Sequence, residues 1–118
     1  MKRVGLAAAV LGAALVVGVV SARAAGTFTV GPGAVTAGAD VTLTFCGFAT
    51  GEGGYYTVGG PSVSGTRFWG PATAGACLTY AESTTGWTPG KYKFIAYVTT
   101  SKGHESKLGS VVVTVNAP

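Results

Sequence analysis

The stretch that decides the fold is DVTLTFC, residues 40–46, in which apolar and polar side chains alternate up to a cysteine. Successive side chains of a β-strand point to opposite faces. Val41, Leu43 and Phe45 are therefore expected on a buried face, and Cys46 is expected on the outward face. The stretch predicts a half-buried strand that ends in an outward-facing thiol.

The only other cysteine, Cys77, lies in a second strand-like stretch, ACLTYAES (76–83). In this stretch Leu78 and Tyr80 are expected to point inward, so Cys77 points outward. Both cysteines thus lie in predicted strands and on outward faces.

Residues 1–24 predict a cleaved secretory signal helix. A basic start precedes an uninterrupted apolar and glycine run over residues 4–20, and small residues at the A-x-A positions end at Ala24. A membrane-spanning helix is the first rival, but the run is somewhat short for one. A pilin-like helix retained in a filament is the second, but no acidic residue follows the start of the run and no long amphipathic helix follows its end. We expect one domain over residues 25–118, secreted or at the cell surface, with no membrane segment once the leader is removed.

The charge of the exported part excludes one class of partner. The whole chain has a formal net charge of +4 at pH 7, but Lys2, Arg3 and Arg23 belong to the leader. Residues 25–118 keep five basic and four acidic side chains, a formal charge of +1. Binding to nucleic acid needs a clustered basic surface, so no nucleic-acid partner is expected.

In an exported protein, two cysteines most simply form one disulfide. A metal-binding or redox pair is the rival interpretation. It has no support, because the chain has no C-x-x-C motif and His104 is its only histidine. We expect a Cys46–Cys77 disulfide and neither a metal ion nor another cofactor.

The exported part is predicted to be all-β. Short alternating runs are separated by glycine, proline and threonine turns, and no segment keeps a helical period, which is typical of a sandwich or barrel. Seven strands in about 94 residues is the count of an immunoglobulin-like antiparallel β-sandwich, whose second and fifth strands are antiparallel neighbours. In that order Cys46 and Cys77 meet at the same edge of one outward face. The predicted strands are residues 27–30, 40–46, 53–59, 66–70, 76–83, 90–100 and 109–115, with GPGAVTAGA (31–39) as a break after the first.

The chain also resembles a family. VTLTFCGFATGEGGYYTVGGP (41–61) is similar to the V-T-V-x-G-x-G-F-x-P-G-E opening of prokaryotic extracellular immunoglobulin-like domains. TPGKYKFIAYVT (88–99) resembles their sixth strand, and SVVVTV (110–115) their closing strand. The resemblance implies roles such as adhesins, surface layers, filaments or appendages of hydrolases. The sixth strand has no cysteine here, so the antibody disulfide between the second and sixth strands is absent.

No catalytic residues are predicted. The four acidic residues are scattered one to a segment, so no two are placed as a carboxylate pair. His104 and Glu105 lie in a polar hairpin, SKGHESK (101–107), which is expected to be a solvated loop tip.

The outward faces of three strands carry apolar side chains. Alternation predicts that Tyr55, Ile95, Tyr97 and Val112 point outward from strands that are neighbours in the immunoglobulin order. A contiguous apolar patch marks an interface. The rival interpretation is a set of isolated surface apolar residues, which are common.

Two functions remain. The first is an exported, non-catalytic structural or cell-surface protein, adhesive or part of a filament or surface layer. It would associate with itself or a surface partner through these residues, or by adding the short uncharged strand at residues 27–30 to a neighbour's sheet. The alternative is a small secreted module that binds carbohydrate or another ligand by stacking on Trp69, Trp87 and Tyr55. For the two tryptophans, we favour a buried position at the edge of the core over a role in stacking on a ligand.

Overall fold

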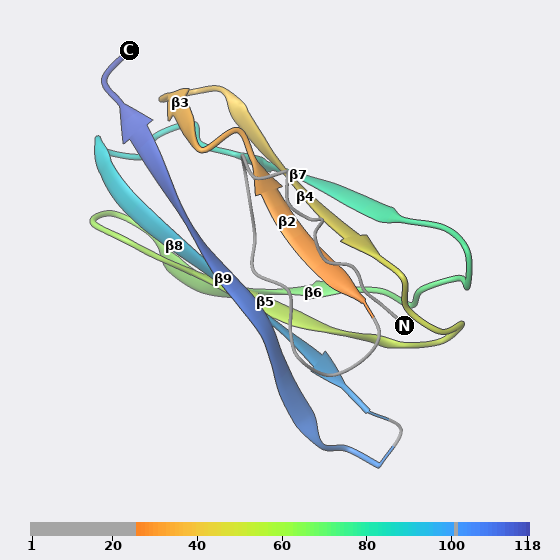
Figure 1. The fold of residues 1–118 in the computed structure, drawn as a ribbon. Coiled ribbons are helices and arrows are strands. Elements are labelled where there is room, and N and C mark those ends of the chain that lie inside the picture. The colour runs from red at the N-terminus through yellow and green to blue at the C-terminus, as the bar shows by residue number, and fades with distance from the viewer. Residues whose placement is uncertain (1–25, 101) are drawn as a thin grey trace, which may run out of the picture.

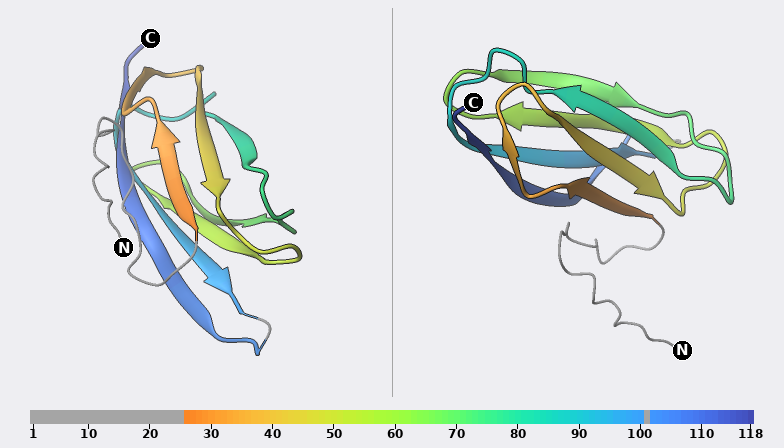
Figure 2. Two further views of the ribbon diagram at one scale, coloured as in Figure 1. Left: turned by 45° about the vertical axis from the view of Figure 1, so that its right-hand side comes forward. Right: turned by 90° about the horizontal axis from the view of Figure 1, so that it is seen from above.

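The computed structural model describes residues 26–100 and 102–118, and these form two β-sheets packed face to face (Figures 1 and 2). The predicted leader lies outside the described residues. The described residues contain no helix that is long and apolar enough to cross a membrane. The strands are β2 (Thr27–Gly31), β3 (Ala34–Thr36), β4 (Asp40–Cys46), β5 (Gly53–Gly59), β6 (Ser64–Trp69), β7 (Leu78–Ser83), β8 (Gly90–Thr99) and β9 (Glu105–Asn116).

The smaller sheet has the strand order β2-β4-β7, and the larger has the order β3-β9-β8-β5-β6. The predicted neighbours are confirmed: β4 pairs antiparallel with β7, and β8 lies between β5 and β9. β2 pairs antiparallel with β4 over its whole length, so this strand is paired within its own chain. β8 and β9 also form a hairpin that extends beyond the rest of the sandwich (Figure 1).

The prediction differs from the structure at β3. The stretch 31–39 was expected to be only a break, but Ala34–Thr36 form a short strand. This strand pairs parallel with β9, so the described residues contain eight strands and are not purely antiparallel. Val35 is buried in the core because β3 places it beside Val115. A local sequence pattern does not show this pairing, because it depends on a strand about 80 residues further along the chain.

The core fills the space between the sheets. Val41, Leu43 and Phe45 of β4 are buried, as their alternation predicted. Phe45 lies at the centre of an aromatic cluster, with its ring stacked on Trp69 at a centroid distance of 4.4 Å and tilted against Phe28 at 5.1 Å. Each fully buried apolar side chain of this size contributes about 1.5–3 kcal/mol through removal from water.

The predicted disulfide is present. Cys46 ends β4 and Cys77 precedes β7, with a Cα–Cα distance of 4.3 Å. The register that pairs Phe45 with Leu78 places the two cysteines next in line, directly opposite each other. Cys46 is half-buried and Cys77 is exposed. Such a bond is compatible with an extracellular protein.

Candidate functional site: the outward face of the larger sheet

The larger sheet has one face on the core and one face toward solvent. In β8, Tyr92, Phe94 and Ala96 are fully buried, and the alternating residues Lys93 and Tyr97 point away from the core. The outward-pointing side of this sheet is called the outer face below. It is the part of the molecule where sequence analysis had expected an interface.

Three aromatic side chains lie next to one another across this face. The strand register pairs Phe68 of β6 with Tyr55 of β5, and Tyr55 with Tyr97 of β8. These three residues, called the aromatic row below, therefore occupy neighbouring positions on three adjacent strands. The same register continues to Lys107 of β9, which pairs with Tyr97.

Tyr55 and Tyr97 are in direct contact. Their rings are stacked, with centroids 4.8 Å apart and an interplanar angle of 24°. The Tyr55 hydroxyl donates a hydrogen bond of 2.8 Å to Glu105 Oε1 in β9. This hydrogen bond raises the pKa of Tyr55 above its ordinary value, because the bond to the carboxylate favours the protonated hydroxyl. The two rings are thereby fixed to each other and to β9.

Phe68 extends the aromatic row to the edge of the sheet. Its side chain is 78% exposed, although neighbouring Trp69 is 3% exposed. The sequence analysis predicted a strand here but did not assign its faces. Had Trp69 been placed inward, alternation would have placed Phe68 outward.

Ile95 and Val112 extend the outer face along the strands. Ile95 lies two residues before Tyr97 in β8 and pairs with Thr57 and Ser110 on its two sides. Val112, 49% exposed, pairs with Lys93, one outward-facing position further along β8. Of the four predicted interface residues, the structure thus brings Tyr55 and Tyr97 into contact and Ile95 next to Tyr97. Val112 lies on the same face, further from the aromatic row.

The outer face is more basic than residues 25–118 as a whole. Exposed Lys91 and Lys93 of β8 and exposed Lys107 of β9 lie on it, together with one carboxylate, Glu105. Hydroxyl side chains fill several of the remaining positions. They belong to Thr57 of β5, Ser64 and Thr66 of β6, and Ser110 and Thr114 of β9.

Trp69 and Trp87 are not on this surface. They are 3% and 8% exposed, so neither presents a ring to a ligand, and the interpretation as buried residues at the edge of the core is confirmed. Trp69 Nε1 donates a hydrogen bond of 2.9 Å to the Tyr97 carbonyl. The Trp87 ring packs against Tyr92 with a centroid distance of 4.6 Å.

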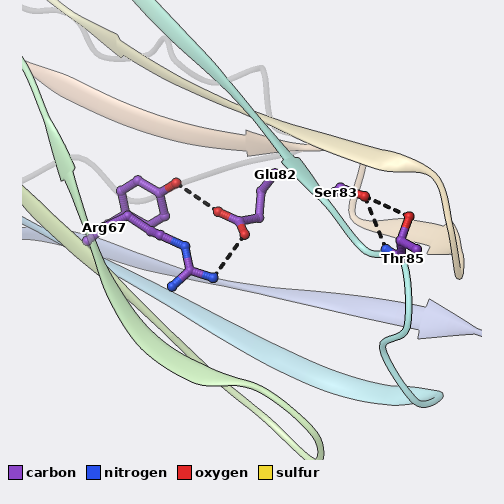
Figure 3. Close-up of polar contacts among 5 residues, drawn as sticks. Arg67, Glu82, Ser83 and Thr85 are labelled. Atoms are coloured by element: carbon purple, nitrogen blue, oxygen red, sulfur yellow. Dashed lines mark hydrogen bonds and ion pairs between the residues drawn. The ribbon is translucent and has the colours of Figure 1, made fainter.

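One polar cluster that the sequence analysis missed joins the two sheets. Arg67 Nη2 in β6 lies 3.1 Å from Glu82 Oε2 in β7 (Figure 3). The other carboxylate oxygen of Glu82 accepts a 2.9 Å hydrogen bond from the Tyr56 hydroxyl in β5. The side chains of Arg67 and Glu82 are 37% and 12% exposed. Because every oxygen of the carboxylate has a partner, the cluster acts as a clamp between the two sheets.

Nothing among the described residues forms a metal site. In residues 26–100 and 102–118, no group of three histidine, cysteine, aspartate or glutamate side chains is arranged to hold a metal ion. His104 is exposed in the turn before β9.

Comparison with known proteins adds no further constraint, because no family model, curated protein or solved structure matches the chain.

Proposed function

We propose that the protein is an exported, non-catalytic immunoglobulin-like domain that acts at the cell surface or outside the cell, by contact through its outer face. The observation that carries this proposal is the exposure of Phe68, 78%, in line with the stacked pair Tyr55 and Tyr97. A large ring left in water costs free energy, so the exposed Phe68 beside two half-buried tyrosines favours a surface that is covered when the protein works.

The strand order supports the immunoglobulin-like part of the proposal. β2-β4-β7 corresponds to strands A, B and E of that fold, and β9-β8-β5 to strands G, F and C. The Tyr92 hydroxyl near the start of β8 donates a 2.6 Å hydrogen bond to the Thr88 carbonyl, four residues upstream. This bond has the form of the tyrosine corner that immunoglobulin-like domains place at the same point.

The first partner we propose is a second copy of the chain, which would make the protein a self-associating structural subunit. β6 is an edge strand, with a neighbour on one side only. Its single charged residue, Arg67, forms an ion pair with Glu82, and Phe68 on the same strand is exposed. Proteins normally protect such an edge with charge or proline, because unpaired backbone groups template strand addition. Pairing of β6 with β6 of a second copy would satisfy these groups and cover Phe68.

The test is the mass of the purified exported protein in solution, measured by light scattering over a range of concentrations. We expect concentration-dependent oligomers that dissociate in Thr66→Lys, which places a charge on the β6 edge. Thr42→Lys is the matched control, because Thr42 is also exposed but lies on β4, the central strand of the other sheet. A wild-type protein that stays monomeric at all concentrations would contradict self-association, as would oligomers that Thr66→Lys leaves intact.

Carbohydrate binding is the second candidate, and one observation favours it. The aromatic row is bordered by hydroxyl side chains and by lysines, and protein interfaces deplete lysine from their cores.

A further inference from the structure

We infer that the outer face binds an anionic polysaccharide, with the aromatic row contacting sugar rings and Lys107 and Lys93 pairing with acidic groups. The inference rests on the proposed role of this face as a contact surface, and it names the chemical class of the partner.

The distribution of charge is the first argument. Of the four lysines in the described residues, Lys91, Lys93 and Lys107 lie on the outer face, and Lys102 lies in the turn before β9. The remaining acidic groups are elsewhere: Asp40 is on β4, Glu52 precedes β5 and Glu82 is held by Tyr56 and Arg67 between the sheets.

The outer face therefore carries three lysines and one carboxylate. Its charge is basic although the formal charge of residues 25–118 is close to zero. Two copies stacked face to face through the outer face would bring like charges together, so the self-association proposed above runs through the β6 edge and this face is left to a partner of opposite charge. An anionic partner would be attracted to the outer face by the same lysines.

The arrangement of the side chains is the second argument. Phe68, Tyr55, Tyr97 and Lys107 follow one another across four adjacent strands. With strands about 4.8 Å apart, this line is roughly 14 Å long, which suits a short stretch of a linear polymer lying across the strands.

The next line of outward positions consists of Thr66, Thr57, Ile95 and Ser110. A sugar ring has an apolar face of C–H groups and a rim of hydroxyl groups. The aromatic rings of the outer face match the C–H face of a sugar, and the threonine and serine hydroxyls beside them match its hydroxyl rim. An anionic peptide has no such apolar face to place against the rings.

Nucleic acid is a weaker match to the same face. Its binding needs a larger number of neutralised phosphates than three lysines supply, and arginine is the residue that contacts phosphates in a bidentate manner. The single arginine of the described residues, Arg67, is engaged with Glu82.

The test is the affinity of the purified exported protein for defined polymers, measured by calorimetry. The probes are three anionic polysaccharides (polygalacturonate, alginate and chondroitin sulfate), neutral dextran, poly-glutamate and single-stranded DNA. We expect binding to at least one anionic polysaccharide, weakened by added salt because the charges are exposed. Phe68→Ser should lower the affinity about three- to tenfold, the amount expected for the loss of one aromatic contact.

Two lysine variants separate the surface from net charge. Lys107→Gln should lower the affinity about two- to fivefold and reduce its dependence on salt, since an exposed ion pair contributes about that much. Lys102→Gln makes the same change in net charge outside the face and should leave the affinity unchanged. Equal effects of the two lysine variants would overturn the assignment of the site.

Equal or tighter binding of dextran, poly-glutamate or DNA would overturn the assignment of the ligand. Failure of all three anionic polysaccharides also overturns the inference, but it leaves the proposed contact function standing if Thr66→Lys still changes the solution mass. Failure of both experiments removes the contact function as well.

Discussion

The Tyr56 hydroxyl in β5 and the Glu82 carboxylate in β7 form a 2.9 Å hydrogen bond that connects the two sheets. Glu82 is also paired with Arg67, so removal of the tyrosine hydroxyl leaves the carboxylate with one of its two partners. We expect Tyr56→Phe to lower the free energy of unfolding by about 1.5–3 kcal/mol, the range for hydrogen bonds to charged groups. Urea unfolding measures this loss, and a change below about 0.5 kcal/mol would show that the bond does not clamp the sheets.

The same tyrosine gives the protein a sensitivity to alkaline pH. Burial, and then the hydrogen bond to Glu82, raises the pKa of Tyr56 above its ordinary value of 10.0. The unfolded chain therefore loses this proton at a lower pH than the folded chain. The stabilisation from the raised pKa is complete below about pH 10 and is lost as the pH rises above that value.

We accordingly expect the free energy of unfolding to fall more steeply above pH 10 in the wild type than in Tyr56→Phe. Parallel curves for the two proteins would mean that Tyr56 ionises equally in both states.

Gly54 in β5 lies too close to β8 to carry a side chain. A Cβ atom at this position would be 2.9 Å from the Val98 Cα and even nearer to the Tyr97 carbonyl oxygen, both of which are backbone atoms. We expect Gly54→Ala to destabilise the fold by about 2 kcal/mol or more, because the strands must move apart. Gly59 in the same strand has nothing within 4 Å of its Cβ position, so Gly59→Ala is the control and should change stability by less than about 1 kcal/mol. Similar losses in thermal unfolding of the two variants would contradict the close approach of β5 and β8.

The disulfide is expected to contribute much of the stability of so small a domain. It joins positions that are 31 residues apart, for which chain-entropy models give about 3–4 kcal/mol. The double variant Cys46→Ser, Cys77→Ser should lose about that amount in denaturant unfolding. The wild type in reductant should unfold at the same denaturant concentration as the double variant, and a wild type indifferent to reductant would argue against a stabilising bond.

Processing of the N-terminus remains a prediction from the sequence, because residues 1–25 lie outside the described residues. The three-part leader predicts that the exported protein begins at or near Ala25. Intact-mass measurement of protein from the culture medium or cell surface would check this, and material that still carries residues 4–20 would refute it.

The sequence was sufficient to predict strands and their buried faces wherever apolar and polar residues alternate regularly. It predicted the bounds of β4 and β5 and the inward side chains of β8. It also predicted the disulfide, since the parity of two strands and their order agreed.

The sequence was insufficient to predict strand bounds where the alternation of apolar and polar residues was interrupted. β9 begins at Glu105, four residues before the predicted start, because a register shift near Leu108 breaks the alternation that identifies a strand. β6 begins at Ser64 and β7 at Leu78, each two residues from the predicted position.

The candidate site was predicted in part. Outward parity located Tyr55 and Tyr97, but their contact requires the register between β5 and β8, which a single strand does not contain. The pairing of Phe68 with Tyr55 and of Lys107 with Tyr97 likewise depends on long-range strand register. The clamp of Tyr56, Glu82 and Arg67 draws on three strands of two sheets, so no local pattern could indicate it.

The short parallel pair of β3 and β9 determines how the domain would carry a mechanical load. Because the two strands run in the same direction, a pull on the chain before β3 and after β9 draws them past each other along their length. All the hydrogen bonds of the pair must then yield together, whereas an antiparallel pair pulled from one end opens one bond at a time. Tension applied at these two points is therefore resisted in shear, at the strand that sequence analysis had taken for a loop.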